Sequence, residues 1–154
     1  MRRSETDLIV LKAVHHEPAL ECQTQGPTIY FDGSCPLCSA EIDHYASRLG
    51  GDQLQFVDVS EENAVLGTGL VSSDAMKRFH VRLVDGTLVS GASAFIAVWE
   101  TLPGWRWAAR LSKIPGATRA LEAIYKLFLP VRPAFSKLAQ SFGARAANPR
   151  ASRK

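Results

Sequence analysis

The alternation of apolar and polar positions becomes regular at Thr28. Residues 28–31 are a short run of β-branched and aromatic side chains that ends at Asp32-Gly33, as expected for a buried strand entering a turn. Beyond the turn, apolar residues recur at helical spacing and are followed by a glycine pair at 50–51; they are Cys38, Ile42, Tyr45 and Leu49. Because Pro36 suits a first helical turn, the pattern predicts a strand, a turn and an amphipathic helix.

The middle of the chain predicts three more strands. Residues 54–59 form a second apolar run, and a strand–helix–strand unit of this length implies parallel pairing through a right-handed crossover. After an irregular segment over 60–73, a short helix is expected to begin at Ser72-Ser73-Asp74. The runs 79–84 and 87–89 are separated by Asp85-Gly86, a strong turn signal that predicts an antiparallel hairpin.

Helical patterns dominate the rest of the chain. A helix over 91–101 is expected to stop at Pro103-Gly104. Two further amphipathic helices are predicted, one before Pro130 and one short one after it; their apolar positions are Leu121, Ile124, Tyr125, Phe128 and Leu129, then Phe135, Leu138, Ala139 and Phe142. The order βαβ, a linking helix, then ββα predicts an α/β, thioredoxin-like fold with additional C-terminal helices.

The 154 residues are enough for one domain. Residues 1–27 are predicted to be a partly disordered N-terminal arm, 28–142 the thioredoxin-like domain with its helical extension, and 143–154 a basic tail. The sequence shows no clean secretory signal and no apolar run long enough to span a membrane. A cytoplasmic location is therefore expected.

Charge is distributed unevenly along the chain. Residues 1–100 carry 7 Lys or Arg against 14 Asp or Glu, whereas residues 101–154 carry 11 against the single acid Glu122. The basic helices either contact an anionic membrane surface or an acidic protein peripherally, or lie against the acidic half of their own domain. No recognition motif accompanies the charge, so no nucleic-acid partner is expected.

The sequence Cys35-Pro36-Leu37-Cys38 at the predicted helix start carries the candidate chemistry. In a CxxC at a helix N-terminus the two thiols share a face, and free N–H groups and the helix dipole lower the pKa of the first thiol. Cys35 is predicted to be the attacking thiolate and Cys38 the resolving thiol of a disulfide exchange. The expected partner is a disulfide-containing protein or a low-molecular-weight thiol substrate, and no cofactor is needed.

Three runs resemble the DCC family of thiol-disulfide oxidoreductases, named for an Asp-x-x-Cys-x-x-Cys pattern; they are residues 30–38, 84–86 and 91–94. The resemblance covers roughly residues 28–128. It implies a thioredoxin-like fold and a dithiol site at Asp32, Cys35 and Cys38. Two roles for Asp32 stay open: proton acceptor for Cys38 during exchange, and cap of the turn or of the helix N-terminus.

Two departures from ordinary thioredoxins leave alternatives to this function. Ile29 stands where those proteins carry a buried acid, and residues 77–79 contain no proline where they carry a cis-proline facing the disulfide. One alternative is a metal or iron–sulfur site on the same cysteines, for which Cys22, His44 and His80 are the further candidate ligands. The other is a non-catalytic, thioredoxin-like binding module. Cys22 is otherwise an incidental thiol or an extra resolving cysteine.

Overall fold

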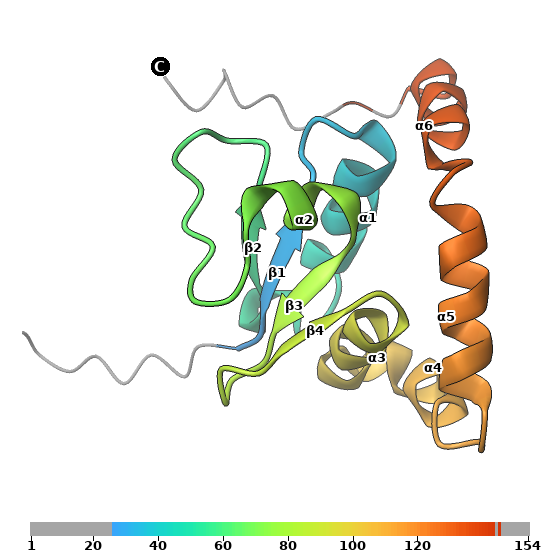
Figure 1. Cartoon of the computed structure of the whole chain (residues 1–154). Helices are drawn as coiled ribbons and strands as arrows, with labels where there is room; N and C mark the ends of the chain where they lie inside the picture. The colour runs from blue at the N-terminus through green and yellow to red at the C-terminus, as the bar shows by residue number, and fades with distance from the viewer. Residues whose placement is uncertain (1–25, 144, 146–154) are drawn as a thin grey trace, which may run out of the picture.

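A four-stranded sheet lies at the centre of the computed structural model, which describes residues 26–143 and residue 145 (Figure 1). Most of the predicted arm and tail, and Cys22 with them, lie outside the described residues. The strands are β1 (Thr28–Phe31), β2 (Gln55–Asp58), β3 (His80–Arg82) and β4 (Leu88–Ser90). Their order in the sheet is β2-β1-β3-β4.

Strand pairing follows the predicted pattern. Helix α1 (Pro36–Ala46) connects β1 to β2, which run parallel with Thr28 opposite Gln55. β3 is antiparallel to β1, and β4 pairs with β3 as the second strand of a hairpin. The α/β, thioredoxin-like fold is therefore confirmed.

Alternate residues of β1 supply two separate cores, because successive side chains of a strand point to opposite faces. On one face, Ile29 and Phe31 pack with residues of α1 and of α3 (Ala92–Thr101), and the side chain of Ile29 is completely buried. On the other face, Tyr30 packs with residues of α2 (Ser72–Lys77) and of the segment that precedes it. Helices on both faces thus hold the end of β1, where the dithiol motif begins.

The additional C-terminal helices pack beside this core. They are α4 (Arg106–Leu111), α5 (Ala117–Phe128) and α6 (Arg132–Ser141). Short 3-10 turns occur at Gly51–Gln53 and at Pro103–Trp105. Helix α5 contacts α3, while α6 contacts α1, and Figure 1 shows α5 standing beside the core with α6 beyond its upper end. Within the described residues, no helix combines the length and apolar character needed to cross a membrane.

The structure corrects the sequence-based prediction in two places. Leu49 was expected on the apolar face of the first helix, but α1 ends at Ala46 and Leu49 is 81% exposed. The chain turns away because Gly50 adopts a left-handed conformation with φ 88°, which favours glycine. Helix α4 was not predicted, since its six residues are too few for a clear helical period.

Candidate active site

The turn that carries the dithiol is held from two sides. The backbone N–H of Gly33 donates a hydrogen bond of 2.8 Å to Oδ1 of Asp58, at the end of β2. A Cβ at this position would clash with the Asp58 carboxylate, so glycine allows the close approach without moving either group. The hydroxyl of Ser39 on α1 donates to the Gly33 carbonyl at 3.3 Å. These bonds fix the direction in which the chain enters α1.

Both cysteines of the motif lie at the N-terminus of α1 as free thiols. Cys35 is the N-cap residue, and its sulfur accepts a hydrogen bond of 3.4 Å from the backbone N–H of Cys38. The Cys38 thiol donates to Cys35 Sγ across 2.8 Å. Only a small movement therefore separates the two sulfurs from a disulfide bond. Cys35 is 8% exposed.

Hydrogen bonding divides charge unequally between the two sulfurs. The pKa of Cys35 falls from 9.0 to about 5, chiefly because the Cys38 thiol donates to it, with help from the Cys38 N–H, Arg132 and Ser136 and against the effect of burial. The same hydrogen bond, together with burial, raises the pKa of Cys38 far above its usual range. At neutral pH, Cys35 is consequently a thiolate and Cys38 a protonated thiol.

Asp32 is placed to organise the turn. Its Oδ1 accepts hydrogen bonds from the backbone N–H and the hydroxyl of Ser34, as in an Asx turn. Its Oδ2 accepts a hydrogen bond of 2.7 Å from the guanidinium of Arg132. The capping role expected for Asp32 is thus present, whereas no hydrogen bond joins Asp32 to Cys38 in the part of the chain described.

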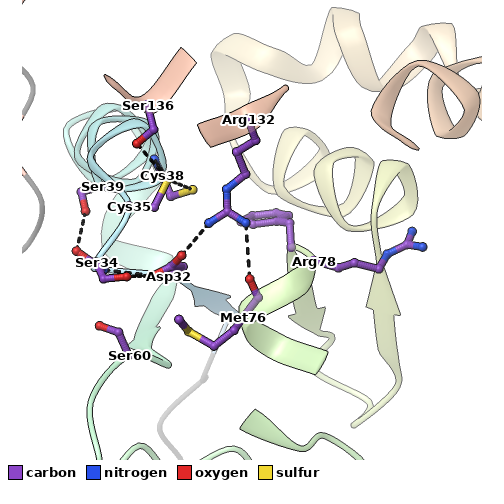
Figure 2. A network of polar contacts seen from close by, with 12 residues as sticks. Asp32, Ser34, Cys35, Cys38, Ser39, Ser60, Met76, Arg78, Arg132 and Ser136 are labelled. Carbon is purple, nitrogen blue, oxygen red and sulfur yellow. Dashed lines mark hydrogen bonds and ion pairs between the residues drawn. The ribbon is translucent and has the colours of Figure 1, made fainter. Parts of the chain in front are cut away.

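Two residues of α6 complete the surroundings of Cys35, and the sequence analysis did not identify either. Arg132 extends from α6 to the Asp32 carboxylate and to the Met76 carbonyl at 3.4 Å, as Figure 2 shows. Ser136 lies one turn further along α6, with its hydroxyl 3.7 Å from Cys35 Sγ. About 100 residues separate these side chains from the motif, so no local spacing reveals the contact.

The two sulfurs face different spaces. Cys35 borders an open groove between the ends of α2 and α6, whose walls include Pro36, Met76, Pro133 and Lys137. Cys38 faces a smaller pocket of about 50 Å³, whose lining includes the aromatic side chains of Phe79, Phe95 and Phe128. The groove therefore brings a substrate next to Cys35, although Cys35 itself is buried and Cys38 is partly exposed.

Helix α5 covers the segment in front of β3, where thioredoxins carry their cis-proline. The backbone N–H of Phe79 donates to the Tyr125 hydroxyl at 2.9 Å, and Arg78 forms an ion pair with Glu122. The described residues contain no cis peptide bond. The backbone at Phe79 is consequently engaged by the protein itself.

The two histidines considered as further metal ligands make their contacts away from the dithiol. His80 is buried in β3, with Nδ1 at 2.8 Å from the Arg78 carbonyl, and His44 contacts the ring of Trp105. Cys22 lies outside the described residues. Within those residues no group of three or more His, Cys, Asp or Glu side chains is arranged to hold a metal ion.

Comparisons with known proteins place most of the described chain in a family. An uncharacterized chloroplastic protein of Arabidopsis thaliana is 28% identical over 109 residues, a match that covers 66% of this chain and 49% of the plant protein. The chain therefore spans about half the length of this curated relative, and the predicted cytoplasmic location stays a prediction. No solved structure matches the chain. A family model described as DCC1-like thiol-disulfide oxidoreductase matches residues 29–138, which include both cysteines and Arg132. The chain belongs to the DCC1-like thiol-disulfide oxidoreductase family.

Proposed function

We propose that this protein exchanges disulfides with a protein or a low-molecular-weight thiol substrate through Cys35 and Cys38. The observation that carries the proposal is the sulfur pair itself, 2.8 Å apart at the start of α1, with one pKa lowered and the other raised. An exchange centre needs this asymmetry, because one sulfur must attack as a thiolate while the other waits as a thiol.

The reaction proceeds in two steps that conserve atoms and electrons. The Cys35 thiolate attacks one sulfur of the substrate disulfide, the substrate S–S bond breaks, and one substrate thiolate leaves. Cys38 then loses its proton and attacks the Cys35 sulfur of the mixed disulfide. The second substrate thiolate leaves as the Cys35–Cys38 disulfide forms. The protein dithiol is oxidised by two electrons, and the substrate disulfide is reduced to two thiols.

Arg132 and Asp32 assist as positioning residues. The guanidinium of Arg132 stabilises the Cys35 thiolate, and the Asp32 carboxylate holds that guanidinium in place. Asp32 also fixes the turn through Ser34. In this arrangement, Asp32 acts on the chemistry through Arg132 and the backbone, without touching the reacting sulfurs.

A single-turnover experiment tests this function. Pre-reduced protein is mixed with bis(2-hydroxyethyl) disulfide, the reaction is quenched with acid, and the products are identified by mass spectrometry. Wild type should release two thiols per protein and end as the Cys35–Cys38 disulfide. Cys38→Ser should stop at the mixed disulfide on Cys35, and Cys35→Ser should release no thiol rapidly. A Cys22→Ser background keeps the third thiol out of the count, and unchanged thiol release by Cys35→Ser would refute the proposal.

The exposed side of the C-terminal helices supports a second candidate function, docking on an anionic membrane surface. Ile124 and Leu127 of α5 are 64% and 76% exposed, and Leu138 of α6 is 52% exposed. The surrounding exposed charges on the described C-terminal helices are cationic, because the acid Glu122 is engaged by Arg78 and by the backbone of Ala92. Apolar side chains set among cations are typical of helices that lie in a membrane interface.

Vesicle sedimentation separates this function from the redox function. The Cys35→Ser/Cys38→Ser protein should bind phosphatidylserine vesicles as wild type does, and should bind neutral phosphatidylcholine vesicles weakly. Leu127→Glu should lower binding roughly tenfold, since it removes an apolar contact and adds a repelled charge. Leu49→Glu is the matched control, because Leu49 is similarly exposed but lies in the turn after α1, away from the C-terminal helices. Equal binding by both variants would contradict the docking proposal.

A further inference from the structure

Resolution of the mixed disulfide requires a base near Cys38. In the mixed disulfide Cys35 carries no charge, but burial still raises the pKa of Cys38, so its thiol does not ionise readily at neutral pH. Positions 29 and 32, which the sequence analysis considered for an acid, offer no free carboxylate to act as this base. Ile29 is completely buried in the core where thioredoxins carry an acid. The carboxylate of Asp32 is already engaged by Ser34 and Arg132.

Glu41 supplies a carboxylate from the same helix. It follows Cys38 by three residues in α1, and residues at this spacing share a helix face. Glu41 and Cys38 both line the pocket of about 50 Å³, whose other walls include Phe79, Phe95 and Phe128. A cavity of this size has room for a water molecule when polar groups line it, so a water-mediated path between the thiol and the carboxylate fits the pocket.

The charged and titratable groups around this pocket come from several elements. On α1 itself, the Tyr45 hydroxyl donates a hydrogen bond of 2.8 Å to Glu41 Oε1. The other such groups lining the pocket are Tyr30 and Asp32 of β1 and its turn, Cys38, Arg78 before β3, Tyr125 of α5 and Arg132 of α6. None of the salt bridges found among the described residues involves Glu41.

This environment makes Glu41 a stronger base than an ordinary glutamate. Burial raises the pKa of Glu41, while the hydrogen bond from Tyr45 and the charge of Arg132 oppose the shift. The Cys35 thiolate raises this pKa further only in the reduced protein, before Cys35 enters the mixed disulfide. A carboxylate with a raised pKa accepts a proton more readily near neutral pH. The tyrosine bond holds one carboxylate oxygen of Glu41, and the residue lines the same pocket as Cys38.

We propose that Glu41 accepts the proton of Cys38 through a water molecule in the shared pocket when Cys38 attacks the mixed disulfide. This inference rests on the proposed dithiol function. The Cys38 S–H bond breaks, the proton moves to the Glu41 carboxylate, the Cys35–Cys38 bond forms, and the substrate thiolate leaves. Glu41 then releases the proton to solvent or to that thiolate, and the same path runs backwards when the protein is oxidising a substrate.

Rapid mixing followed by acid quench measures the two steps separately. Reduced Glu41→Gln protein is mixed with bis(2-hydroxyethyl) disulfide between pH 5 and 9, and the mixed disulfide is followed by mass spectrometry. Its formation should keep the wild-type rate, because Cys35 is intact. Its resolution should be about 100-fold slower at neutral pH, with the gap closing at high pH as hydroxide ionises Cys38. Asp43→Asn, an exposed acid on the same helix, is the matched control and should behave as wild type.

A second variant tests the same idea without removing the carboxylate. Tyr45→Phe deletes the hydrogen bond that lowers the Glu41 pKa, so the midpoint at which the resolution rate rises with pH should move upward. Unchanged resolution in Glu41→Gln, an equal slowing of both steps, or an unchanged midpoint in Tyr45→Phe would each overturn the role of Glu41. Wild type that never closes the Cys35–Cys38 bond would instead overturn the proposed function.

Discussion

The Arg132 guanidinium lies 2.7 Å from the Asp32 carboxylate, joining α6 to the turn in front of the dithiol across 100 residues of sequence. Both side chains are largely shielded, with exposed fractions of 17% and 13%. The C-terminal helices added to the thioredoxin-like core therefore form part of the candidate active site. Because Arg132 also lowers the pKa of Cys35, the reactivity of the first cysteine depends on α6 being in place.

Removing this cation should make Cys35 less acidic. The pKa of Cys35 is lowered in the folded protein, so its thiolate is present above pH about 5 and is lost as the pH falls through that value. Alkylation by iodoacetamide should follow this titration, and Arg132→Gln should move its midpoint to higher pH. Arg119→Gln, which removes an exposed arginine of α5, is the control and should leave the midpoint in place. An unmoved midpoint in Arg132→Gln would show that the guanidinium does not act on the thiolate.

The hydrogen bond from Cys38 should lower the pKa of Cys35 more than Arg132 does. It is the largest cause of the lowered Cys35 pKa, ahead of the Cys38 N–H and Arg132. Cys38→Ala should therefore move the alkylation midpoint of Cys35 further upward than Arg132→Gln does. Mass spectrometry of the alkylated peptide assigns the reaction to Cys35 in both variants. A smaller shift in Cys38→Ala than in Arg132→Gln would contradict this order.

The ion pair should also contribute to stability. Arg132→Gln leaves the shielded Asp32 carboxylate without its cation, which should cost about 1–3 kcal/mol in the free energy of unfolding. Urea denaturation of the reduced protein measures this loss. Asp32→Asn/Arg132→Gln should recover part of it, because no unpaired charge remains, and the double-mutant cycle gives the coupling between the two side chains. Fully additive losses would mean that the pair is not coupled.

A side chain at position 33 should destabilise the turn in front of the dithiol. A Cβ there would meet the Asp58 carboxylate, which already accepts hydrogen bonds from Gly33 and Ser60, so Gly33→Ala must displace either that carboxylate or the turn that carries the cysteines. We expect a loss of roughly 1–3 kcal/mol in the free energy of unfolding and slower alkylation of Cys35 at pH 7. Gly104→Ala is the matched control, since a Cβ there meets no atom within 4 Å. Equal stability of the two variants would contradict the predicted clash.

Local pattern was sufficient to predict the elements that present the dithiol. The apolar run of β1, the Asp32-Gly33 turn and the CxxC at the start of α1 follow from neighbouring residues, and the structure confirms each of them. The hairpin was likewise predicted from its turn, although β3 is shorter than the run 79–84. The prediction that Leu49 lies on the apolar face of α1 was wrong, because the spacing of apolar residues does not show where a helix ends. Gly50 redirects the chain after the helix.

The residues that surround the two sulfurs were harder to predict. Arg132 and Ser136 reach Cys35 only after α6 packs on α1, and the sequence near them shows a basic amphipathic helix with many possible contacts. Glu41 did have a local signal, its position one turn after Cys38. Its significance depends on the pocket that it shares with Phe79, Phe95 and Phe128, which come from other parts of the chain.

The most direct test of the central claim is the redox equilibrium of the two cysteines. Purified protein is equilibrated in a series of glutathione redox buffers, the free thiols are alkylated after acid quench, and the state of each cysteine is read by mass spectrometry. The proposed function predicts that Cys35 and Cys38 change together as one two-electron couple, with the intramolecular disulfide as the oxidised product. Cysteines that stay reduced across the series, or that only form separate adducts with glutathione, would contradict it.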